Sequence, residues 1–151
     1  MKKFIIILIT SCLGLACKKN NSNACPEPTL DCSGVSCFLY NYNFEFRIVD
    51  ENTGVDLVFG SNPRYNTSDI KLYNDASQSS EISLTADNTA GVFRTQLASQ
   101  EMYLVIAGTD IYKLDASFKA VDCCSSKIKD LSMGTTNICT CCGDVIAVPV
   151  F

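Results

Sequence analysis

The chain has no histidine among its 151 residues, which removes several classes of chemistry. Histidine is the usual general base and a common ligand of catalytic zinc, and it completes the Ser-His-Asp and Cys-His arrangements. No glycine-rich phosphate loop of either standard type occurs. Carboxylate pairs could still do acid–base chemistry, but the acidic residues are spread over turn-like stretches. The sequence therefore predicts a protein that is not an enzyme and uses no cofactor.

Long apolar segments are also scarce. An apolar run covers residues 4–16 after a start with two lysines, and no second long run follows. A membrane-spanning helix needs about 20 apolar residues, so this run is too short to stay as an anchor. A basic start, a short apolar stretch and a small residue before a cut site are typical of a secretory signal. We expect residues 1–16 to be removed on export.

Basic residues are few in the remaining chain. It keeps 10 of the 12 lysines and arginines and all 16 acidic residues, so its formal charge is −6. Nucleic acids and anionic lipid surfaces both attract basic proteins. The charge therefore argues against a nucleic-acid partner and against electrostatic attachment to a membrane.

The segment 13–17, LGLAC, resembles the lipobox of bacterial lipoproteins. In that family the cysteine receives a diacylglyceryl group, a peptidase cuts before it, and the new amino end is acylated. Ala16 is the small residue that the cut needs, whereas Gly14 stands where the family prefers Leu, Val or Ile. The segment 9–12 fits that preference, but lipid on Cys12 would leave an apolar region shorter than the usual 7–15 or so residues. The resemblance therefore implies lipid on Cys17, with Cys12 as the alternative.

A lipid anchor of this kind implies a place in the cell. Two or more acyl chains on one residue hold a protein stably on a bilayer. The start Cys17-Lys18-Lys19 also resembles lipoproteins of the Bacteroidota, in which early acidic residues favour the cell surface. Here two lysines follow Cys17 instead, and the first acidic residue is Glu27, ten residues later. The resemblance implies a cell-envelope protein on the outer membrane that faces the periplasm.

Cysteine is abundant, with ten in the chain. Removing Cys12 with the signal and assigning Cys17 to lipid leaves an even number, which in an exported chain indicates disulfides. The eight candidates are Cys25, Cys32, Cys37, Cys123, Cys124, Cys139, Cys141 and Cys142. Three precede residue 40 and five follow residue 120, so full pairing requires an odd number of bridges between the two groups.

The pairing within the second group is open. We expect Cys123 or Cys124 to pair with the group at 139–142, and we expect no bond between chain neighbours, whose Cα atoms lie too close. The alternative is a thiolate site for copper(I) or zinc, built from Cys139, Cys141 and Cys142 with the pair at 123–124. The spacing differs from the two-residue gap of structural zinc sites, and an oxidising compartment consumes free thiols.

Residues 17–36 are polar and contain Pro26, Pro28 and Gly34, which predicts a tether and an irregular cystine-bearing lead-in. After them, short apolar or alternating stretches recur between turn residues, and no capped amphipathic helix is evident. The expected strands cover 44–48, 55–59, 70–72, 82–84, 92–97, 102–107, 111–118, 128–131, 138–142 and 145–150. This pattern predicts one all-β domain over 37–151, an antiparallel β-sandwich.

Segments 46–59, 107–110 and 122–124 resemble small lipoproteins of the Bacteroidota. The resemblance implies an immunoglobulin-like or transthyretin-like sandwich and supplies no catalytic residue. We therefore expect a binding or structural module whose partner is an envelope protein or a glycan, with the membrane as a further partner through the lipid.

Asp50, Asn52, Gly54 and Asp56 alternate as the oxygen ligands of calcium loops do. The same residue types belong in a hairpin turn for backbone reasons. Ser61 stands where an EF-hand loop needs glutamate, so we favour the turn.

Four tyrosines could form a face for a sugar, and they fall near expected loops or edges: Tyr40, Tyr42, Tyr65 and Tyr73. Packing of the rings at the sheet edges, with the hydroxyls at the surface, is the favoured interpretation.

Overall fold

The computed structural model describes residues 25–39, 41–97 and 99–151. The expected signal at 1–16, the lipid site Cys17 with its alternative Cys12, and Tyr40 lie outside the described residues. Among the described residues, no helix is long and apolar enough to cross a membrane. The elements are β1 (Asn41–Asp50), η1 (Thr67–Asp69), β2 (Ile70–Tyr73), β3 (Glu81–Ile82), β4 (Thr85–Asp87), β5 (Val92–Gln96), β6 (Glu101–Ile106), β7 (Asp110–Asp122), β8 (Ser125–Met133), β9 (Thr136–Thr140) and β10 (Val145–Val150).

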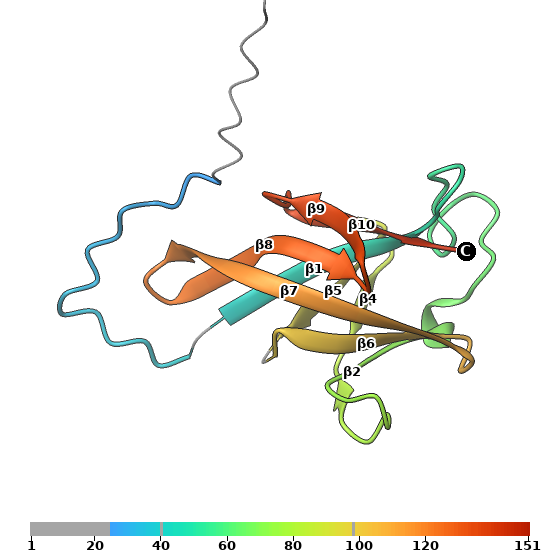
Figure 1. Ribbon diagram of the computed structural model, residues 1–151, viewed down its shortest axis with the longest axis horizontal. Helices are drawn as coiled ribbons and strands as arrows, with labels where there is room; N and C mark the ends of the chain where they lie inside the picture. The colour runs from blue at the N-terminus through green and yellow to red at the C-terminus, as the bar shows by residue number, and fades with distance from the viewer. Residues whose placement is uncertain (1–24, 40, 98) are drawn as a thin grey trace, which may run out of the picture.

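The strands form a single curled sheet of mixed direction (Figure 1). Its order is β3-β2-β6-β7-β8-β1-β5-β4, with β10 paired to β1 and β9 paired to β8. The all-β prediction is confirmed. The prediction of purely antiparallel pairing is wrong, because β1 runs parallel to both β8 and β10. Alternation along a strand reports which face is buried and says nothing of a neighbour's direction, so the sequence could not reveal this.

β1 is the strand at which the sheet forks. Along one edge, Asn41 to Asn43 pair with β8, and Glu45 to Asp50 pair with β10. The other edge of β1 pairs with β5. At the fork, Lys127 of β8 forms an ion pair with Asp144, just before β10, at 2.7 Å. The sheet therefore bends around β1 and encloses a core.

The core follows from the alternation that the sequence predicts for β1. Phe44, Phe46 and Ile48 are buried, and Glu45 and Arg47, which alternate with them, are half-buried. Phe46 stacks on Phe44 with ring centroids 4.6 Å apart and on Phe93 of β5 at 5.4 Å. The same cluster includes apolar residues of β2, β6, β7, β8 and β10, so both branches of the fork share one core.

One expected strand is absent: residues 55–59 form turns, with a single bridge between Val49 and Asp56. The cause is the Asp56 carboxylate, which accepts the N–H groups of Val58 at 2.8 Å and Phe59 at 2.7 Å. These bonds curl the backbone, as Asp does in turns. Leu57 and Val58 are still buried, so the apolar signal was a core signal rather than a strand signal. Of the expected strand at 82–84, only Ile82 lies in a strand, the short β3, and β4 begins after it at Thr85.

Candidate functional site

The most distinctive feature of the molecule is a covalent strap, which we define as residues 25–39 with the disulfides that fasten them. All eight candidate cysteines are paired, as Cys25–Cys141, Cys32–Cys123, Cys37–Cys124 and Cys139–Cys142. The first three join the two cysteine groups, which confirms the expected disulfide framework and its odd number of cross-links. None joins neighbours in the chain, also as predicted. In Figure 1 the strap loops out beside the turn between β7 and β8.

The expectation that Cys123 or Cys124 pairs with the 139–142 group is wrong. Cys124 precedes β8, whereas Cys139 lies opposite Leu131 near the other end of that strand. Some seven residues of extended chain separate the two positions, or about 23 Å, far beyond the 4.4–6.8 Å or so that a disulfide allows between Cα atoms. Closeness in sequence failed as a guide because the extended chain of β8 holds these cysteines apart.

The β7–β8 turn is the main attachment point of the strap. Cys123 and Cys124 form the turn itself and bind two strap cysteines five residues apart. The strap turns between those two cysteines, where the N–H of Val35 donates to the carbonyl of Cys32 at 3.1 Å. Gly34 takes a φ of +79° there, a conformation that favours glycine. The strap then enters β1 through the Asn41 N–H, which donates to the Cys124 carbonyl at 3.0 Å.

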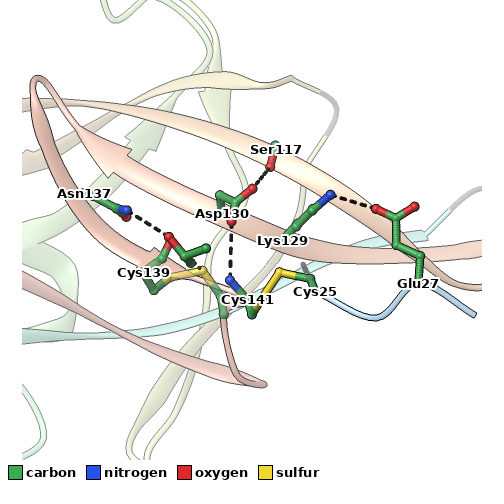
Figure 2. Close-up of a disulfide and its surroundings, with 10 residues drawn as sticks. Cys25, Glu27, Ser117, Lys129, Asp130, Asn137, Cys139 and Cys141 are labelled. Carbon is green, nitrogen blue, oxygen red and sulfur yellow. Dashed lines mark hydrogen bonds and ion pairs between the residues drawn. A yellow bond between two sulfur atoms is a disulfide. The ribbon is translucent and has the colours of Figure 1, made fainter. Parts of the chain in front are cut away.

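The second attachment point lies at the end of β9 and is shown in Figure 2. Cys25 is buried and bonds to Cys141, and the N–H of Cys141 reaches the carboxylate of Asp130 at 3.4 Å. Beside this bridge, Lys129 of β8 pairs with Glu27 of the strap at 2.8 Å. The hydrogen bond and the charge of Lys129 lower the pKa of Glu27, and Glu27 raises the pKa of Lys129. Glu27 is exposed and Lys129 is only half-buried, so the ion pair adds little stability and the disulfide holds the strap here.

This pairing bears on the metal alternative. Copper(I) and zinc bind deprotonated thiols, and a disulfide sulfur is not one. Every cysteine in the described part of the chain is in a disulfide. Within residues 25–39, 41–97 and 99–151, no three His, Cys, Asp or Glu side chains are grouped so as to hold a metal ion.

An open groove of about 660 Å³, which we call the polar groove for its polar side chains, is lined by residues of β7, β8 and β9 and also includes the apolar Ala116 and Leu131. Its polar lining consists of Asp115, Ser117, Asp130, Ser132, Thr135, Asn137 and Thr140. Ladder pairing places Asp115 opposite Ser132 and Ser117 opposite Asp130, so carboxylates and hydroxyls alternate across β7 and β8. Ser117 donates to Asp130 at 2.9 Å (Figure 2).

The groove offers hydroxyl, amide and carboxylate groups on paired strands. The Asn137 amide donates to Thr140 at 2.9 Å, and Lys113 lies 3.3 Å from the Asp115 carboxylate. These groups suit hydrogen bonding to a polar, hydroxyl-bearing ligand. The polar alternation at 115, 117, 130 and 132 was visible in the sequence. That these residues share one groove was not, because it depends on the register of β7 and β8 and on the bulge at 117–118.

The four residues weighed for calcium lie in and beside the turn that follows β1. One oxygen of Asp50 accepts the N–H of Asn52 at 3.1 Å and both the N–H and the hydroxyl of Thr53 at 2.8 Å. These bonds, that of the Thr53 hydroxyl foremost, lower the pKa of Asp50. Gly54 has a φ of +69°, and Asp56 makes the separate turn described above. The carboxylates thus act as acceptors in turns, the role favoured from the sequence.

Of the four candidate tyrosines, the three that the structure describes have different packing partners. Tyr42 packs edge-on against Phe118 at 5.2 Å, Tyr65 lies under the Arg64 guanidinium at 5.3 Å, and Tyr73 is buried in β2. Each ring therefore packs within the fold.

No protein-family model matches the chain, and no curated protein or solved structure matches it significantly.

Proposed function

We propose that the chain is a lipid-anchored protein of the bacterial cell envelope, cut before Cys17, whose β-domain is a non-enzymatic binding or structural module. The strap carries this proposal. Structural disulfides belong to exported proteins and are rare in the cytosol, and three of them fasten the strap to the sheet. Export and the lipobox-like segment at 13–17 together support lipid on Cys17. Lysines rather than acids follow Cys17, and this supports a position on the outer membrane that faces the periplasm.

The first disulfide suits a domain held by its amino end. Cys25 follows Cys17 by eight residues, so the tether spans at most about 26–29 Å. A pull on the tether reaches Cys25 and passes through Cys141 to the end of β9. Without this bridge, the pull would pass along the strap to Cys32 and through Cys123 to the β7–β8 turn. The three strap bridges therefore divert a pull on the tether before it reaches β1, and Cys25–Cys141 is the first of them.

The polar groove is the surface that we assign to binding. It lies on three paired strands, and the strap is fastened beside it at Cys141. Its hydroxyl, amide and carboxylate groups suit a glycan or a polar segment of an envelope protein. The two branches of the forked sheet share one core, and this supports the finer assignment of an immunoglobulin-like or transthyretin-like sandwich.

The lipid site is tested by labelled palmitate. Cys17→Ser is expected to abolish both incorporation of the label and removal of residues 1–16, because the thiol that receives the lipid is gone. The matched control Cys12→Ser is expected to keep both. If the Cys12→Ser chain lost the label and the Cys17→Ser chain kept it, Cys12 would be the lipid site. An unlabelled parent chain would overturn the proposal.

A further inference from the structure

Exposed apolar side chains occur on the strap and on the end of β7 to which the strap is fastened. Phe38 is 99% exposed, Leu39 70%, Val35 51% and Val121 49%, and we call these four residues the apolar tip. Leu30 of the strap is also exposed. The other exposed large apolar residues among those described, Val55, Ile111, Val145 and Phe151, are dispersed over other parts of the sequence. Single exposed apolar residues are ordinary, but a group of them marks an interaction surface.

The disulfides hold the apolar tip together. Phe38 and Leu39 lie between Cys37, which is bonded to Cys124, and Asn41, which donates to the carbonyl of the same Cys124. Val35 lies in the strap turn that is closed onto Cys32, and Val121 is the third residue before Cys124. The tip therefore consists of side chains on two segments, which the Cys32–Cys123 and Cys37–Cys124 disulfides and the Asn41 hydrogen bond hold together at the β7–β8 turn. Burial in the core would require those bonds to break.

The tether between Cys17 and Cys25 is long enough for the apolar tip to reach the membrane. Cys25 is bonded to Cys141, which lies beside Asp130 of β8. Six residues of extended chain separate Asp130 from Cys124 in the β7–β8 turn, so the attachment point of Cys25 lies about 20 Å from that turn. The tether from Cys17 to Cys25 reaches about 26–29 Å. The tip can therefore touch the bilayer while the lipid on Cys17 stays inserted. Attachment also keeps the bilayer always within reach, so a contact too weak to bind a free protein suffices.

The acids beside the apolar tip accept local hydrogen bonds: Asp122 accepts the Cys124 N–H at 2.8 Å, and Asp31 accepts the Ser33 N–H at 3.0 Å. Lys127, near the start of β8, is paired with Asp144. Phe and Leu are residues that insert into the boundary between headgroups and acyl chains. We propose that the apolar tip is a second membrane contact, which inserts into the bilayer surface and sets the orientation of the lipid-anchored domain. This inference rests on the proposed lipid anchor.

The absence of tryptophan from the chain makes a clean test possible. Phe38→Trp introduces a single fluorescent reporter in the apolar tip. Ile111→Trp is the matched control, because Ile111 is also exposed but lies ten residues along β7 from Val121, about 33 Å away. Both lipidated mature chains are reconstituted in phosphatidylcholine vesicles, with either ordinary or brominated acyl chains, which quench tryptophan on contact.

We expect the Phe38→Trp chain to lose about half of its emission in brominated vesicles and the Ile111→Trp chain to lose almost none, since the insertion depth is about 5–10 Å. Adding Leu39→Asp to the Phe38→Trp chain is expected to reduce that loss severalfold. Equal quenching of both reporters, or no quenching of the Phe38→Trp chain, would overturn the inference. Flotation with the vesicles is measured on the same samples. A chain that fails to float has lost its anchor, whereas a floating chain without quenching contradicts the apolar tip alone.

Discussion

Phe46→Ala is expected to lower the free energy of unfolding by about 3–5 kcal/mol, the usual effect of deleting a buried ring. Phe46 is 0% exposed and stacks on Phe44 and Phe93. It is also a residue at which β1 is paired on both edges, with Phe93 of β5 and Ile146 of β10. The cavity would therefore open where the two branches of the sheet meet, and the backbone there has little freedom to collapse into it.

Urea unfolding of the non-reduced domain measures this effect. Phe38→Ala is the matched control, because it removes the same ring from a side chain that is 99% exposed, and we expect a change within about 0.5 kcal/mol. Similar losses for the two variants would show that the core is not centred on β1.

Removing the Cys25–Cys141 bridge with Cys25→Ser/Cys141→Ser is expected to lower the free energy of unfolding by about 3.5 kcal/mol in the chain-entropy model. The relevant loop is not the whole separation of 116 residues, because Cys32–Cys123 already joins the chain nearby. The circuit runs from residue 25 to 32, across that bridge, and from 123 to 141. About 25 residues are thus freed in the unfolded state.

The matched variant is Cys37→Ser/Cys124→Ser, which opens a circuit of only about six residues through the neighbouring bridge and should lower stability by about 2 kcal/mol. If each bridge acted by its own separation of 116 or 87 residues, the two variants would differ by only about 0.3 kcal/mol. A difference near 1.5 kcal/mol between the losses of the two variants therefore supports a strap in which each bridge closes only the circuit that the other bridges leave open. Equal losses would contradict it.

The sequence predicted well what depends on local periodicity and on counting. Alternation placed Phe44, Phe46 and Ile48 in the core, and the uneven division of cysteines required at least one bridge between the ends of the domain. Both arguments use only neighbouring residues or parity, which do not depend on the path of the chain.

The partners of the cysteines and the direction of the strands depend on that path, and no local pattern reports it. Cys123 and Cys124 face the strap because the β7–β8 hairpin extends to it, and their own stretch of chain offers no sign of this. The groove shows the same limit. Asp115 and Asp130 belong to one surface only through the register of two long strands with a bulge between them.

Glu27 and Lys129 show why some of the site was missed. They are separated by 102 residues and meet only because Cys25–Cys141 brings the strap beside β8. Each is an ordinary surface charge in the sequence. Long-range contacts of this kind follow from the disulfides, so the disulfide map is the observation on which the rest of the site depends.

The most direct test of the account is the intact mass of the non-reduced mature protein. We predict a chain that begins at a lipid-modified Cys17 and is lighter by eight hydrogens, because the other eight cysteines are oxidised in four disulfides. If Cys12 carried the lipid instead, Cys17 would stay in the mature chain as a ninth, unpaired cysteine. A chain with an unmodified Cys17 or with free thiols among the eight would contradict the account.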